Sequence, residues 1–148
     1  MFKPTKRIHY SVKALLDLSL QPLDQPNSVK AIAQRQELPA PYLEKLLIQL
    51  RQAGLVDAIR GAHGGYRLAK QPQEISLNQI LAAVGETASP LIETAPLADQ
   101  VEDWVTYSIW KRLHLKLKQA LETITLEDLY YDARSWQASQ DTEEHFII

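Results

Sequence analysis

The sequence predicts a mainly α-helical protein with one small β-hairpin and a long helix in its C-terminal half. Apolar residues recur at three- and four-residue steps through several segments, which is the spacing of one face of a helix. Four of the five glycines lie between Gly54 and Gly65, and glycine gathers where a tight turn needs positive φ. Neither glycine nor proline occurs from about residue 97 to residue 124, so one long helix is predicted there.

Three helices are predicted before Gly54. Thr5 is a suitable N-cap for the first, and the prolines within residues 21–27 end it. Ser28 caps a short second helix, and Pro41 is placed at the first position of a third, after a turn over residues 37–40. The apolar stripe of this third helix consists of Leu43, Leu46, Leu47 and Leu50. Gly54 then ends it.

Residues 55–59 and 66–70 predict two short strands around the loop 60–65. Two short helices joined by a turn of about four residues form a helix-turn-helix. A glycine-rich basic hairpin that follows directly is typical of a wing. Ser76 caps a fourth helix that Gly85 ends, so a winged helix-turn-helix unit is predicted over residues 1–84.

A linker is expected over residues 85–96, followed over residues 97–135 by the long helix and a short terminal helix that Thr125 and Asp128 begin. The polar, acidic tail 136–148 is expected to be loosely ordered. A long helix of about 40 Å exceeds what the small N-terminal unit can cover, so a second copy of the chain is the expected partner of its apolar stripe. The predicted dimerisation residues are Val101, Val105, Ile109, Leu113, Leu117 and Ile124.

The composition and the charge distribution of the chain exclude several classes of function. The chain of 148 residues has no cysteine, which excludes disulfides, a cysteine nucleophile and thiolate-ligated metal centres. No segment approaches a membrane span or a signal peptide, so a cytoplasmic protein is expected. Residues 1–70 hold 11 Lys and Arg against 5 Asp and Glu, a net charge of +6, whereas residues 71–148 carry a net charge of −8. This asymmetry places polyanion binding in the first half.

The third helix has a polar side opposite its leucine stripe, and this side is a candidate for reading base edges. Lysine donates to guanine, glutamate accepts from cytosine, glutamine bonds adenine and tyrosine contacts phosphate. The candidates there are Pro41, Tyr42, Glu44, Lys45 and Gln49, with Ile48 placed to touch a thymine methyl or to pack locally. The plain alternative is the solvated side of an amphipathic helix, and the short helix before it and the basic hairpin after it favour DNA.

The hairpin tip and two helix N-termini supply candidates for phosphate and minor-groove contacts. Arg60 and His63, with the backbone N–H groups of Gly61, Gly64 and Gly65, are suited to phosphates or to a narrow minor groove. Thr5, Lys6, Ser28 and Lys30 lie at helix N-termini, where free N–H groups favour phosphate. An ordinary turn and simple capping are the respective alternatives.

Metal and catalytic motifs are lacking in the sequence. The four histidines are far apart and do not have the paired spacing of a metal site. No nucleophile elbow, phosphate-binding loop or pair of carboxylates is present, so no enzymatic activity is expected.

Taken together, these residues resemble the Rrf family of bacterial winged-helix transcription regulators (IscR/NsrR/CymR-like). The likeness covers about residues 2–130 and is most specific in PYLEKLL and RGAHGGYRLAK. It implies a homodimer on a pseudo-palindromic operator, with each third helix in a major groove and each wing in a minor groove. On this resemblance Tyr42, Glu44 and Lys45 match recognition-helix contacts, Arg60 a minor-groove contact, and Thr5, Lys6 and Ser28 phosphate contacts.

The chain departs from the cluster-binding members of that family. In those members cysteines precede the IW pair of the long helix, the last of them six residues before the Trp, and some have a histidine three residues before it. Trp104 and Tyr107 stand at these two places. The resemblance therefore implies a member without an iron–sulfur cluster, and we expect no cofactor or metal.

The sequence thus predicts a dimeric, sequence-specific DNA-binding regulator, either a repressor or an activator. The alternative is a winged-helix protein-interaction adaptor without independent DNA binding. The regulator responds to a small-molecule effector held near residues 91–98 or Trp104, to a partner protein, or to no signal, and the sequence does not favour one of these three. Operator and target genes are not readable from the residues.

Overall fold

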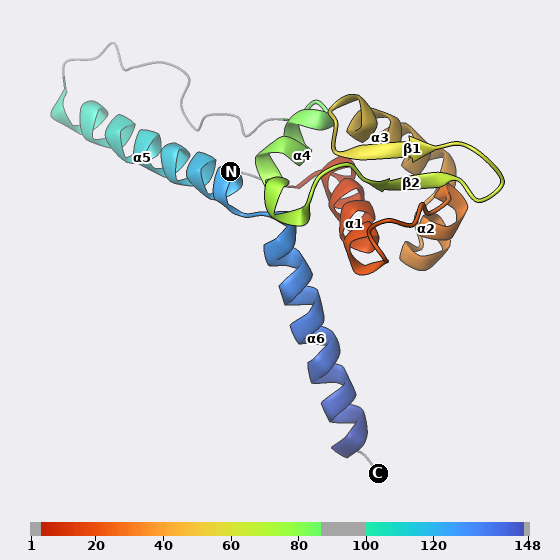
Figure 1. The fold of residues 1–148 in the computed structure, drawn as a ribbon. Coiled ribbons are helices and arrows are strands. Elements are labelled where there is room, and N and C mark those ends of the chain that lie inside the picture. The colour runs from red at the N-terminus through yellow and green to blue at the C-terminus, as the bar shows by residue number, and fades with distance from the viewer. Residues whose placement is uncertain (1–3, 87–99, 147–148) are drawn as a thin grey trace.

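The computed structural model describes residues 4–86 and 100–146. Figure 1 shows α1, α2, α3 and a two-stranded hairpin packed together at one end, with α5 and α6 extending from the other side of α4. The predicted linker 85–96 and the helix start at residue 97 lie mostly outside the described residues. The elements are α1 (Lys6–Leu20), α2 (Val29–Gln36), α3 (Ala40–Gln52), β1 (Val56–Ile59), β2 (Gly65–Leu68), the 3-10 helix η1 (Pro72–Glu74), α4 (Leu77–Ala83), α5 (Val101–Thr123) and α6 (Leu126–Phe146).

The first two helices begin where their capping residues predict. The Oγ atoms of Thr5 and Ser28 accept the N–H groups of Ile8 and Ala31 at 3.3 and 3.1 Å. These bonds satisfy N–H groups that have no partner within their helices. α3 begins at Ala40, one residue earlier than predicted, with Pro39 as its N-cap, and it ends before Gly54, whose φ of 78° suits glycine.

The hairpin is the predicted wing, with strands slightly shorter than the sequence suggested. β1 and β2 pair antiparallel in a register that places Val56 opposite Leu68 and Ile59 opposite Gly65. Val56 and Leu68 are buried in the core, so the base of the hairpin is fixed while its tip extends away from the domain.

The core lies between the three N-terminal helices, α4 and the corner that joins α5 to α6. Leucines and isoleucines fill it, including Leu15, Ile32, Leu43, Leu47, Leu50, Ile75, Ile80 and Leu126. Ser76 caps α4 as predicted, and its side chain also forms a full capping box with Gln79. Leu121 and Leu126 reach into the core from α5 and α6. The corner of the long helices is thus part of the same core as the N-terminal helices and not a separate module.

The short terminal helix and the loosely ordered tail predicted after Thr125 are wrong, because α6 runs on to Phe146. The capping that starts it is confirmed, since the carboxylate of Asp128 accepts the Thr125 N–H at 2.8 Å. The segment has no glycine or proline, so nothing in its sequence ends the helix. A polar composition fits an exposed helix as well as a loosely ordered tail. Among the described residues, no helix is both long and apolar enough to cross a membrane.

Candidate nucleic-acid interface

The packing of α3 determines which of its side chains face solvent. Leu43, Leu47 and Leu50 are fully buried and Leu46 is nearly so. This stripe turns the opposite face outward and exposes Pro41, Glu44, Lys45 and Ile48. The exposed face therefore offers a cation, a carboxylate and an apolar contact within two helical turns, a combination that suits base edges in a major groove.

Two predicted contact residues on α3 are half-buried. The ring of Tyr42 meets that of Tyr10 edge to face, with ring centroids 5.8 Å apart. Gln49 lies beside the leucine stripe and is likewise only partly exposed. The Tyr42 ring thus contributes to packing between α1 and α3, and contact of Tyr42 or Gln49 with DNA stays a prediction.

The wing tip presents Arg60, Gly61 and His63 to solvent. Gly61 has a φ of 121°, which a residue with a side chain rarely adopts. The N–H of Gly64 donates to the carbonyl of Gly61 at 3.0 Å, so it is not free to bind phosphate as the sequence suggested. A Cβ at Gly64 would overlap the Ile59 carbonyl, and one at Gly65 would overlap the Asn27 carbonyl. Gly64 and Gly65 therefore serve the close packing of the hairpin.

The predicted phosphate contacts fall into two separate groups. Ser28 and Lys30, at the start of α2, follow directly on Asn27, which pairs with Tyr66 of the wing. Thr5 and Lys6, at the start of α1, lie near the end of α4, where Thr5 Oγ1 is 3.4 Å from a carboxylate oxygen of Glu86. A phosphate at Thr5 would meet the negative charge of Glu86, so the geometry supports Ser28 more strongly than Thr5.

A polar network behind α2 was missed at the level of sequence. Arg35 binds the buried carboxylate of Asp17 and also the side chain of Asn27, which links α1, α2 and the loop beside the wing. The hydrogen bonds to Asp17 raise the pKa of Arg35 above its usual value, against an opposing effect of burial. The available signal was an acidic residue, Asp17, inside an apolar helix face.

α5 carries the predicted dimerisation face, and most of it is exposed. Val101, Val105, Ile109 and Leu113 are between 40% and 71% exposed, and Ile124 lies at the corner with α6. Leu117 differs, because it packs partly against the core of its own chain. Trp104, Trp110 and Leu115 are also exposed on α5 and were not among the predicted residues. The unpaired apolar surface is thus wider than the predicted stripe.

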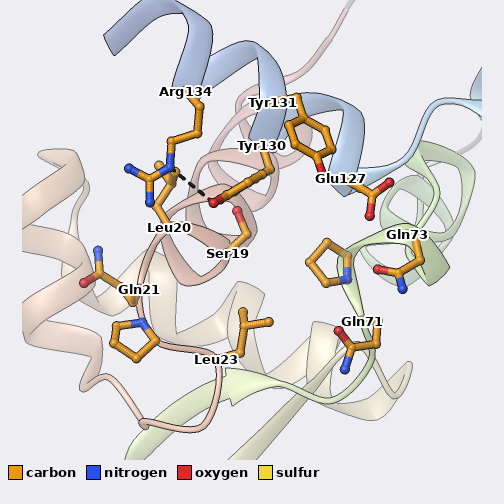
Figure 2. A pocket seen from close by; sticks show the side chains of 12 residues that line it. Ser19, Leu20, Gln21, Leu23, Gln71, Gln73, Glu127, Tyr130, Tyr131 and Arg134 are labelled. Carbon is orange, nitrogen blue, oxygen red and sulfur yellow. Dashed lines mark hydrogen bonds between the residues drawn. The ribbon is translucent and has the colours of Figure 1, made fainter. Parts of the chain in front are cut away.

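A hollow of about 520 Å³ lies between the end of α1, η1 and α6, and Figure 2 shows the side chains that line it. Arg134 projects over it from α6, and its Nε donates to the hydroxyl of Tyr130 at 3.3 Å. Leu20, Leu23, Gln71 and Glu127 also line it. None of the residues singled out by sequence lines it. It brings α1 and α6 together around one space.

The positions at which an iron–sulfur cluster would be held do not have suitable ligands. Trp104 and Tyr107 stand there, with their rings edge to face and centroids 6.4 Å apart. An indole and a phenol are not the thiolate or imidazole ligands of such clusters. Across residues 4–86 and 100–146, no three His, Asp or Glu residues gather in a way that would hold a metal ion. The donor set therefore does not fit the cluster.

The chain is similar to known proteins both in sequence and in structure. A family model described as "Rrf2: Iron-dependent Transcriptional regulator" matches residues 4–132. The chain is 59% identical over 146 residues to a Synechocystis protein named as an HTH-type transcriptional regulator, with 99% of both chains covered. Among solved structures it is similar to CymR, the global cysteine regulator of B. subtilis, at 35% identity and a TM-score of 0.77, covering 88% of this chain and 98% of that one. It is also similar to T. potens IscR, at 38% identity and a TM-score of 0.72, covering 92% and 91%.

Proposed function

Because this chain belongs to the Rrf2 family of transcriptional regulators, we propose that it binds a pseudo-palindromic operator as a homodimer. The fold and the family assignment make it a winged helix-turn-helix regulator and not an enzyme. The observation that carries the proposal is the exposed polar face of α3 together with the basic wing, which Figure 1 shows next to α3.

In this proposal α3 enters the major groove and the wing reaches an adjacent minor groove. Glu44 and Lys45 read base edges, while Arg60 inserts into the minor groove, where narrow width strengthens the negative potential. Ser28 and Lys30 contact phosphate at the N-terminus of α2, where free N–H groups point outward. Thr5, Lys6, Tyr42 and Gln49 complete the contact set with less support from their surroundings.

The homodimer forms through α5. Its exposed valine, isoleucine, leucine and tryptophan side chains form an apolar surface along a helix of about 35 Å. An apolar surface of this extent in water favours association, and a two-fold pair of identical helices is the economical arrangement. A two-fold dimer also matches an operator with two half-sites.

The regulator works without an iron–sulfur cluster. The chain has no cysteine, and Trp104 and Tyr107 occupy the positions that the resemblance assigns to ligands. Iron and sulfide analysis of protein purified without oxygen tests this, since stoichiometric iron with sulfide would contradict it.

A small-molecule effector acts through the hollow between α1, η1 and α6. Of the two effector sites considered from the sequence, residues 91–98 lie outside the described residues and Trp104 is exposed on α5, whereas the hollow touches both α1 and α6. Its volume falls within the range of small-molecule sites. A thermal-shift screen of metabolites tests this: an effector should stabilise the wild type but not the Arg134→Ala variant.

The regulator is proposed to act in the cytoplasm, where the DNA is.

DNA binding is tested by titrating the protein's own promoter region at several salt concentrations. The logarithm of the association constant should fall linearly with the logarithm of salt concentration, because each phosphate contact releases counterions. A discrete footprint is expected as well. The adaptor alternative predicts no discrete footprint on any genomic fragment, and an affinity independent of salt would contradict the phosphate contacts.

A further inference from the structure

The buried carboxylate of Asp17 holds one end of α2 in place. The Asp17 side chain on α1 is 2% exposed, and Arg35 donates to it through Nε at 3.0 Å and through Nη2 at 2.7 Å. Gln36 adds a third donor at 2.8 Å. A carboxylate removed from water needs charged partners with good geometry, and the two-pronged guanidinium provides this. The position of Arg35 is therefore fixed by the interior of the protein.

The same guanidinium extends to the loop before α2. Nη2 of Arg35 donates to Oδ1 of Asn27 at 2.8 Å. The other end of the Asn27 amide donates to the carbonyl of Gln25 at 3.1 Å. Because both ends of the side chain are held, the orientation of the Asn27 backbone is restricted as well.

The backbone of Asn27 is the outer partner of the wing. Its N–H donates to the Tyr66 carbonyl at 2.8 Å, and the Tyr66 N–H donates back at 2.7 Å. This isolated antiparallel bridge lies on the side of β2 away from β1. Gly65 lets the two backbones approach, since a Cβ there would overlap the Asn27 carbonyl.

We propose that Asn27 and Arg35 are positioning residues that set the wing relative to α2 and α3, so that both DNA contacts can be made at once. The inference rests on the proposed function. Asp17 fixes Arg35, Arg35 fixes Asn27, and Asn27 fixes β2 and through it Arg60 at the tip. Ser28, the next residue after Asn27, caps α2, so one short segment connects the wing to a helix N-terminus that faces phosphate.

Holding the wing at its base reduces the conformational entropy that is lost when the protein binds DNA. A wing that moved freely at its base would have to be immobilised each time it entered a minor groove, and that loss of entropy would weaken the complex. A wing already held at Asn27 meets the groove in one orientation.

The first test uses the protein without DNA. Hydrogen exchange of the Tyr66 amide should be roughly tenfold faster or more in Asn27→Ala and Arg35→Lys. Each variant removes the hydrogen bond between the Arg35 guanidinium and the Asn27 side chain. The amides of Leu46 and Leu47 should exchange as in the wild type in Asn27→Ala, which leaves the ion pair intact. Asn78→Ala and Arg112→Lys are matched controls at exposed positions outside the network. Unchanged exchange at Tyr66 in both test variants would overturn the proposal.

The second test uses DNA selected by the wild-type protein. In Asn27→Ala, protection from hydroxyl radicals in the flanking minor groove should fall several-fold, while protection of guanine N7 in the major groove persists at saturating protein. A purely structural role for Asn27 would reduce both protections together, and that result would contradict positioning. If the wild type protects no DNA at all, the proposed function fails, and the exchange experiment still decides whether Asn27 holds the wing.

Discussion

The backbone N–H of Leu77 donates to the carbonyl of Ile124 across 2.9 Å, and this bond joins the start of α4 to the corner between α5 and α6. Leu126 returns a second bond to the carbonyl of Ile75 at 2.8 Å. The pairing makes an antiparallel bridge between Ser76 and Thr125, the residues that precede α4 and α6. The helix proposed to dimerise is thus fastened to the unit proposed to bind DNA.

Leu126→Ala should lower the free energy of unfolding by about 2–5 kcal/mol, since it leaves a cavity beside this junction. The Leu126 side chain is fully buried in the core. Leu23→Ala is the matched control, because Leu23 is 40% exposed. Urea denaturation followed by circular dichroism measures both. Equal losses in the two variants would show that the corner does not pack as described.

Ile109→Asp should raise the dimer dissociation constant by roughly a hundredfold, about 2.7 kcal/mol, because an unpaired charge then replaces an apolar contact. Ile109 is 40% exposed in the single chain, so the variant should keep its helical content. Sedimentation equilibrium measures association, with Lys118→Asp as an exposed control on α5. A dimer unaffected by Ile109→Asp would place the interface elsewhere.

Gly65→Ala should destabilise the protein by about 3 kcal/mol, since its φ of 152° is strained for alanine and the new Cβ displaces the Asn27 carbonyl. Gly61→Ala should cost only about 1 kcal/mol, because a Cβ there meets open space despite a φ of 121°. Thermal unfolding distinguishes the two. The reverse order would contradict the close approach of β2 to Asn27.

Ser11→Ala should be neutral or stabilise the protein by about 0.5–1 kcal/mol. Ser11 Oγ is buried on α1 and has no hydrogen-bond partner among the described residues, so its removal relieves an unsatisfied polar group and improves helix propensity. Ser19→Ala should instead cost about 0.5 kcal/mol, because Ser19 Oγ donates to the Leu16 carbonyl at 2.6 Å. Denaturation curves of the two variants should therefore move in opposite directions.

Glu44→Ala should relax sequence preference at one operator position by about 1–3 kcal/mol, because Glu44 lies on the exposed face of α3. Lys6→Ala should weaken every sequence by a similar factor and reduce the salt slope by about 1. Competition binding against single-base operator variants measures both effects. A uniform loss from Glu44→Ala would remove it from the base-reading set.

The helices could be predicted from the sequence because their determinants are local. Ser28 and Ser76 are followed by helices that they cap, and the leucine spacing of α3 places its buried and exposed faces correctly. The tip of the wing was found because glycines mark tight turns wherever they gather. The candidate site on α3 was therefore predictable as a surface.

The interactions between distant segments were not predictable. Nothing in the local sequence around Asn27 indicates that its backbone pairs with Tyr66, or that Arg35 reaches Asp17. The extent of α6 was misjudged for a different reason, because an exposed polar helix and a disordered tail have similar compositions. The hollow beside Arg134 also depends on packing between α1, η1 and α6, which periodicity within one helix does not reveal.

Because α5 is attached to the rest of the domain at one end, a small change in its angle moves its other end over a larger distance. With the corner at Thr125 as pivot, a tilt of about 10° would carry the far end of this roughly 35 Å lever through about 6 Å. That distance approaches two base-pair steps along a DNA duplex. A small rearrangement at the Thr125 corner would thus shift the two α3 helices of the proposed dimer out of register with their half-sites.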